Sequence, residues 1–302
     1  MKEEILNFYK QTSLYTDLGL YKEFASTLPD NIEELCRLIR NQLIHPFDLK
    51  DEEEKSNPNS FYGDMTKIPE TALIYENDLY PTAIGILSEL LRRDPKLSNN
   101  RDILDKLHVC CRETSILLVS ILKAKGIPAR CRSGFTSYVS PTDGAGDHWI
   151  CEYYDVLENK WKLVDSTMCY DEETLDYFEI DFNLFDIPKD KFIFGAESYL
   201  GLRNGKYQTK DIFCFSNPFE YGLKAAIRGL FYDFHSLMNN EIIFLHNPKY
   251  LKDKNFVLTE EEYKELDNLA TLMLNPDENF NKLLDIWNST PKFRIMAGGM
   301  NS

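Results

Sequence analysis

The stretch from His108 to Arg130, HVCCRETSILLVSILKAKGIPAR, places two adjacent cysteines at the start of an apolar segment of helical character. A cysteine at a helix N-terminus lies near the positive end of the helix dipole and near unpaired backbone N–H groups, and both favour the thiolate. Cys111 occupies that position, and the same N–H groups could receive the oxyanion that forms when sulfur attacks a carbonyl carbon. Because a thiol without a base is a poor nucleophile near neutral pH, this candidate needs a partner elsewhere in the chain.

His148 and Asp165 are the candidates for that partnership. His148 opens a predicted strand directly after a glycine-containing loop, and Asp165 follows the strand that pairs with it. In a hairpin the two side chains can lie a rung or two apart, so that the carboxylate orients the imidazole. The sequence alone does not fix the register of the two strands, so this geometry is a hypothesis.

The elements that would hold these three residues follow one another along the chain. A helix over Cys111–Lys125 ends at Gly126, with Pro128 beyond it. Aromatic and β-branched runs after it predict strands, the last two joined as a hairpin. The predicted order is strand Ala129–Val139, flexible loop Ser140–Asp147, strand His148–Leu157, turn Glu158–Lys160 and strand Trp161–Val164.

Three segments in this region, CRETSILLVSILKAKGIPAR, DHWICEYYD and NKWKLVDST, resemble in that order the core motifs of the transglutaminase-like superfamily, a branch of the papain-like cysteine enzymes. The resemblance spans roughly Leu107–Thr167. It implies that Cys111 is the nucleophile, His148 the base and Asp165 the orienting acid. It also implies an α+β fold with a papain-like/transglutaminase-like core, in which the nucleophile helix packs on an antiparallel sheet. The family includes acyl transferases, peptidases, amide hydrolases and members that have lost catalysis, so the motifs imply a chemistry without naming the acceptor.

The flanking segments predict helices that pack around this core. We expect a single domain over residues 1–302, with a helical N-terminal region (1–106), the catalytic core (107–170) and a mainly helical C-terminal region (171–302). Lys50–Lys67 has the charge run and turn residues of a loop. The predicted helices are Asn31–Leu43 with Asp30 as cap, Pro81–Arg92, Pro218–Asn239, a helix capped by Thr259 and Glu262, and Glu278–Trp287.

Composition limits the classes of partner. The 302 residues include 34 basic and 49 acidic side chains, a net charge of −15, which argues against nucleic-acid binding and against adsorption to anionic membranes. The first residues hold no apolar stretch long enough for a signal peptide, and no window approaches the ~18 apolar residues of a membrane span. Seven scattered cysteines without a CxxC pair favour free thiols in a reduced, cytoplasmic protein over a disulfide framework.

Several other polar residues have a less specific interpretation. The sequence predicts no cofactor, and a zinc site built from Cys110, Cys111, Cys131 and His148 is disfavoured because the spacing matches no ribbon or finger. His108 is a second-choice base whose position points it less naturally at the sulfur. The remaining candidates are Cys131 and Cys151 as core side chains, Trp149 and Trp161 as packing residues, Arg130 and Arg132 as solvent-facing charges or carboxylate ligands, and His45 and Tyr62, which nothing in the sequence places at a cleft.

The expected function is attack by the Cys111 thiolate on an amide or peptide carbonyl, through a thioester intermediate. The expected partner is a peptide or protein amide. Hydrolysis is favoured over amine transfer, and a non-catalytic binding protein that keeps the fold remains an alternative. A second oxyanion donor is expected from the segment upstream of Cys111.

Overall fold

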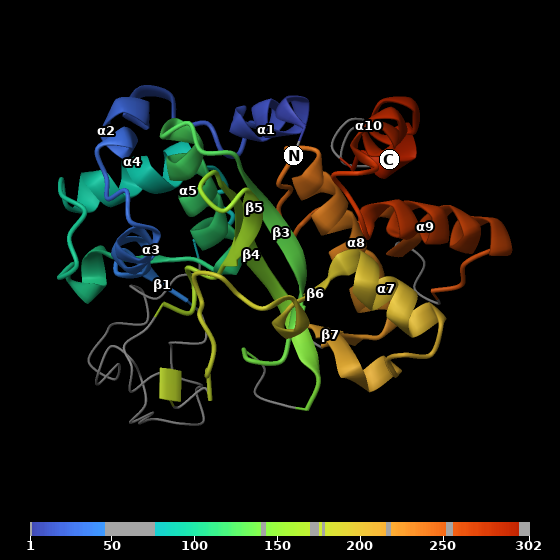
Figure 1. The fold of residues 1–302 in the computed structure, drawn as a ribbon. Helices are drawn as coiled ribbons and strands as arrows, with labels where there is room; N and C mark the ends of the chain where they lie inside the picture. Colours follow the sequence, from blue (N-terminus) through green and yellow to red (C-terminus); the bar gives the residue numbers. More distant parts are fainter. Residues whose placement is uncertain are drawn as a thin grey trace.

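The computed structural model describes residues 2–45, 76–139, 143–169, 175–176, 179–215, 219–251 and 256–295. Figure 1 shows its helices and strands. The helices are α1 (Glu3–Lys10), α2 (Lys22–Ser26), α3 (Ile32–Arg40), α4 (Ala83–Arg93), α5 (Cys111–Ala124), α7 (Gly195–Arg203), α8 (Leu223–Leu237), α9 (Glu260–Met273) and α10 (Phe280–Ser289). The strands are β1 (Leu43–Ile44), β2 (Leu107–His108), β3 (Ala129–Thr136), β4 (Ala145–Asp155), β5 (Lys160–Val164), β6 (Ile193–Phe194), β7 (Ile212–Cys214) and β8 (Glu220–Tyr221).

A six-stranded sheet with long central strands forms the middle of the molecule. Its order is β6-β3-β4-β7-β8, and β5 pairs with the other half of β4. The β3–β4 and β4–β5 pairs are antiparallel, with Cys151 opposite Cys131 on one side and opposite Val164 on the other. The short β4–β7 pair is parallel. The predicted hairpin is therefore present, and its register places Asp165 just beyond the last paired residue of β5.

Helix α5 is enclosed on all sides. Every residue from Cys111 to Lys123 is buried, because α5 lies between the sheet and the helices α2, α3 and α4 (Figure 1). Burying each large apolar side chain contributes about 1.5–3 kcal/mol, so this helix is a main part of the core. Gly126 ends it in the left-handed conformation (φ +78°), as the sequence predicts.

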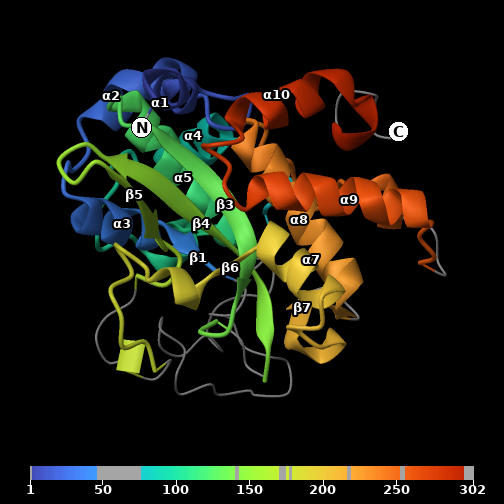
Figure 2. The same ribbon diagram turned by 45° about the vertical axis from the view of Figure 1, so that its right-hand side comes forward.

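The C-terminal helices pack beside strand β3 of the sheet. Helix α8 packs on β3, α7 packs on α8, and α9 packs on α7 (Figures 1 and 2). Thr259 caps α9 together with Glu262, as predicted. The α+β architecture expected from the sequence, a helix packed on a largely antiparallel sheet with further helices at both ends, is the one observed.

Several predicted boundaries were wrong, one because of a local helix cap and the others because of strand pairing. Asn31 and not Asp30 caps α3, because the Asn31 side chain accepts a hydrogen bond from the Glu34 N–H group. Leu43 belongs to β1, since the chain turns away from the helix after Arg40 to pair with β2. Strand β4 begins at Ala145, so the last three residues of the predicted loop are paired with β3 or β7.

Helices α1, α2 and α7 were not predicted from the sequence. The predicted loop Lys50–Lys67, Tyr62 and the first residues of the predicted loop Ser140–Asp147 lie outside the described residues. None of the helices in the described part of the chain has the length and apolar character needed to cross a membrane.

Candidate active site

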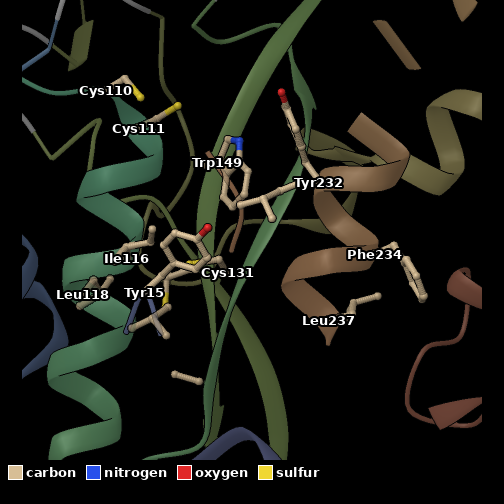
Figure 3. Close-up of a cluster of buried hydrophobic side chains, with 14 of the residues drawn as sticks. Tyr15, Cys110, Cys111, Ile116, Leu118, Cys131, Trp149, Tyr232, Phe234 and Leu237 are labelled. Atoms are coloured by element: carbon tan, nitrogen blue, oxygen red, sulfur yellow. The ribbon is translucent and has the colours of Figure 1, made fainter. Parts of the chain in front are cut away.

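Cys111 is the first residue of α5, and its side chain hydrogen-bonds His148 of β4. Its side chain is 7% exposed. Within the described part of the chain no side chain caps the helix at Cys110, so the backbone N–H groups of the first turn are not taken up by a cap. Figure 3 shows Cys110 and Cys111 side by side at the start of α5, with Trp149 between that helix and the one that carries Tyr232.

A hydrogen bond fixes the helix against the strand that carries His148. The Ser115 hydroxyl, one turn after Cys111, donates to the backbone carbonyl of Trp149 over 3.0 Å. Trp149 is buried and packs against Tyr232 of α8. The start of α5 and the His148 segment of β4 are therefore held in register by a contact that was not predicted from the sequence.

His148 and Asp165 are in direct contact. The Nε2 atom of His148 lies 2.7 Å from Oδ2 of Asp165, and both side chains are almost completely buried. This contact leaves Nδ1 as the ring nitrogen available to the Cys111 sulfur, and a hydrogen bond joins the His148 and Cys111 side chains. The structure thus brings together the three residues that the sequence singled out.

Three groups besides His148 donate hydrogen bonds to the Asp165 carboxylate. Oδ1 accepts hydrogen bonds from the backbone N–H groups of Thr167 (2.9 Å) and Met168 (3.2 Å). Oδ2 accepts from the Tyr138 hydroxyl over 2.9 Å as well as from His148. The Asp165 N–H group donates to the Leu184 carbonyl. The carboxylate therefore has a fixed orientation, with Oδ2 directed at the imidazole.

Tyr138 was not recognised from the sequence. Its ring also meets the His148 ring edge to face, with centroids 6.1 Å apart. Burial, followed by the negative charge of Asp165, raises the pKa of the Tyr138 hydroxyl well above its ordinary value, which keeps it a hydrogen-bond donor. An aromatic residue at the end of a predicted strand carries no signal that would have indicated this role.

The electrostatics of the site favour an ionised pair. Hydrogen bonds from the neighbouring Cys110, from His148 and from His45 hold the pKa of the Cys111 thiol well below its ordinary value, against the effect of burial. Burial by itself would lower the pKa of His148, but the negative charges of Asp165 and Cys111 raise it to about 10. Near neutral pH these shifts correspond to a thiolate beside an imidazolium.

Cys110 has the opposite character. Burial raises the pKa of its thiol well above the ordinary value, and the charge of Glu113 acts in the same direction. Its sulfur donates to Oε2 of Glu113 over 2.9 Å, while Glu113 pairs with Arg112. A thiol carries one proton, so Cys110 can donate to Glu113 or to Cys111 but not to both at once. The pKa shifts of the adjacent thiols have opposite directions, because that of Cys110 is raised and that of Cys111 is lowered.

His45 is an addition to the site. It directly follows β1, which pairs in parallel with β2 and so brings it beside the residues that lead into α5. His45 is 8% exposed, and its imidazole hydrogen-bonds the Cys111 sulfur. His108, the second-choice base, is itself a residue of β2 and is buried. The sequence could not show that His45 reaches the sulfur, because the partners in the two paired strands, such as Ile44 and His108, are 64 positions apart in the chain.

The two strand arginines do not face solvent, contrary to the favoured prediction. Arg130 and Arg132 are 1% and 3% exposed, and both donate to Glu152. Arg132 also forms two hydrogen bonds with Asp233 of α8, and Arg130 pairs with Asp277. They are internal charges that join strands to helices.

Metal binding receives no support from the described residues, in which no three His, Cys, Asp or Glu side chains gather in a way that could hold an ion. All seven cysteines are buried, and none of them forms a disulfide. Cys131 and Cys151, opposite each other in the sheet, belong to the apolar core as predicted.

A cysteine at the start of a helix, beside a buried histidine–carboxylate pair, is the arrangement of a thiol-enzyme fold. Residues 90–166 match the family described as the transglutaminase-like superfamily. The match contains Cys111, His148 and Asp165. A comparison with curated proteins found no match.

Among solved structures, the chain is similar to a crystal structure described as that of a "putative cysteine protease" from Cytophaga hutchinsonii, with 15% sequence identity and a TM-score of 0.33. The similarity covers 56% of this chain and 44% of that protein. The chain therefore spans less than half the length of this neighbour.

Proposed function

We propose that this chain is a cysteine-dependent enzyme that attacks an amide or peptide carbonyl, with Cys111 as nucleophile, His148 as base and Asp165 as the residue that orients His148. The observation that carries the proposal is the buried 2.7 Å contact between His148 and Asp165, formed while His148 also hydrogen-bonds the Cys111 sulfur. Nucleophile, base and orienting group in hydrogen-bond contact are the arrangement that thiol catalysis requires.

The chemistry follows from these positions. The thiolate adds to the carbonyl carbon, a C–S bond forms, and the carbonyl electron pair moves to oxygen. The backbone N–H of Cys111, at the start of α5, can hydrogen-bond that oxygen. When the tetrahedral intermediate collapses, the C–N bond breaks and the amine leaves with the proton from His148. Water, deprotonated by His148, then adds to the thioester carbon; the C–S bond breaks, and the acid and the Cys111 thiolate are released.

The second half-reaction separates the candidate functions. Hydrolysis uses water as acceptor, whereas a transglutaminase uses an amine. We favour hydrolysis of a peptide or protein amide. We also propose a reducing, cytoplasmic location, which is supported by the cysteines, because all are buried and none forms a disulfide. A non-catalytic relative would form no thioester at all.

The test uses p-nitrophenyl acetate as an activated acyl donor. We expect a burst of p-nitrophenolate, and peptide mapping should locate the acetyl group on Cys111. Cys111→Ser should abolish the burst, while the matched neighbour variant Cys110→Ser should keep it, because the Cys110 thiol is held protonated beside Glu113.

Methylamine added after the burst distinguishes the acceptors. Release of acetate at an unchanged rate supports hydrolysis, and capture as N-methylacetamide supports amine transfer. If the wild-type protein shows neither a burst nor an acetylated Cys111, the enzymatic proposal is wrong and the binding-protein alternative takes its place.

A further inference from the structure

The position of His45 is set by a pair of short parallel strands. Ile44 lies opposite His108, and the Val109 N–H group donates to the Ile44 carbonyl over 3.0 Å. The chain reaches Cys111 two residues after Val109. This pairing therefore carries His45, the next residue after Ile44, alongside the segment that opens α5.

The side chain of His45 is directed at the reacting sulfur. It is buried, and its imidazole hydrogen-bonds Cys111. A side chain that donates to the sulfur anion also lies close to the place where charge develops on the oxygen of a carbonyl attacked by that sulfur. Preorganised donors at this place are usually the largest single contribution to acyl-transfer catalysis.

The other groups that contact the sulfur are already committed. His148 uses Nε2 for Asp165, and its other nitrogen is needed to hold the thiolate and to carry the leaving-group proton. Cys110 offers only a weak S–H donor, and that sulfur lies 2.9 Å from the Glu113 carboxylate. His45 is the second imidazole that hydrogen-bonds this sulfur.

We propose that His45 is a catalytic residue, namely the second oxyanion donor, and that its imidazole N–H acts together with the backbone N–H of Cys111. As the C–S bond forms and the carbonyl electron pair moves to oxygen, both N–H groups hydrogen-bond the oxyanion. As the intermediate collapses, the pair returns to the carbonyl and no proton passes through His45. This inference rests on the proposed function and assigns a group that the sequence left unassigned.

The test compares two reactions of the same sulfur. Acylation by p-nitrophenyl acetate passes through a tetrahedral oxyanion, whereas alkylation by iodoacetamide is a direct displacement at carbon and forms none. Loss of one oxyanion donor typically costs about 10²–10³ in rate. His45→Ala should therefore lower the acylation rate by about that factor, while the alkylation rate, compared at the plateau of its pH profile, should stay within about threefold of wild type.

Two further variants make the comparison specific. His45→Gln keeps an N–H donor on a flexible side chain and should recover at least part of the lost acylation. If His45→Ala fails to fold, the acylation and alkylation rates of His45→Gln are compared with those of the wild-type protein instead. The matched control is His108→Gln, which alters the buried imidazole on the neighbouring strand and should leave the ratio of acylation to alkylation unchanged.

Each outcome decides a question. Equal loss of acylation and alkylation in His45→Ala would mean that His45 only sets thiol ionisation, and acylation at the wild-type rate would mean that it has no role at the oxygen. Either result overturns the inference while leaving Cys111 as nucleophile. Absence of acylation in the wild-type protein would instead refute the proposed function, and the inference would be refuted with it.

Discussion

Replacement of Asp165 by asparagine gives the sharpest test of how the site works. In the wild-type protein Oδ1 is occupied by two backbone N–H groups, and Oδ2 faces His148 and the Tyr138 hydroxyl. The asparagine oxygen must stay with the two backbone donors, because an amide NH₂ group cannot accept from them. The NH₂ group is then turned towards His148 and confronts it with a donor instead of an acceptor.

The expected loss has two parts. A hydrogen bond to a charged group is worth about 1.5–3 kcal/mol, which corresponds to about 13- to 160-fold in rate. In addition, Nε2 must give up its proton to accept from the amide, so the proton moves to the nitrogen that faces the sulfur. An imidazole in that tautomer cannot act as a base towards water, and such a change can bring the total loss to about 10⁴.

Deacylation is the step to measure, because water attack on the thioester depends on His148 as base. After a p-nitrophenyl acetate burst, the steady rate of Asp165→Asn should be about 10²–10⁴ below that of wild type. Alkylation by iodoacetamide should also gain a pH dependence near neutrality. Without the Asp165 charge, the pKa of His148 is no longer raised to about 10, and the imidazolium that stabilises the thiolate is partly lost.

Tyr138→Phe is the matched control, since it removes the other side-chain donor to the same oxygen and keeps the carboxylate. Its deacylation rate should fall by less than about tenfold, as expected for one lost hydrogen bond with the charge retained. A steady rate for Asp165→Asn within threefold of wild type, with an unchanged pH profile, would refute the argument that this carboxylate orients His148.

Two more predictions concern pH and stability. Because the pKa of Cys111 is held low and that of His148 is raised to about 10, the pair is ionised across the neutral range, and alkylation of wild-type Cys111 should be nearly constant between pH 7 and pH 9. An ordinary thiol with a pKa of about 8.5 would instead speed up about 25-fold over that interval, and such a rise would contradict the ion pair. Asp233→Ala should lower the free energy of unfolding in urea by about 3–5 kcal/mol, because it leaves the buried Arg132 guanidinium without its bidentate partner; a loss below about 1 kcal/mol would show that Glu152 suffices.

Local signals in the sequence predicted the central elements well. The helix that begins at Cys111 has an apolar run and a glycine–proline stop signal, and α5 ends one residue before the predicted end. The hairpin that carries His148 follows from aromatic and β-branched runs around a polar turn. These signals are reliable because they act between residues close together in the chain.

Boundaries were less predictable where tertiary pairing overrides local preference. Leu43 continues the apolar stripe of α3 but lies in β1, because β2 offers it backbone partners from a distant part of the chain. Arg130 and Arg132 read as surface charges on a strand. They are buried because Glu152, Asp233 and Asp277 supply carboxylates from three other parts of the chain.

For the site, the sequence by itself determined which residues have the right chemistry and the right local setting: a thiol at a helix start, an imidazole in one strand of a hairpin and a carboxylate at the end of the other. Only the tertiary structure decided how these groups meet. The strand register brings Oδ2 of Asp165 to His148, Ser115 ties the helix to the strand, and the β1–β2 pair delivers His45 to the sulfur. These contacts join side chains that are distant in sequence, and their geometry depends on how whole elements pack, which no local pattern of residues encodes.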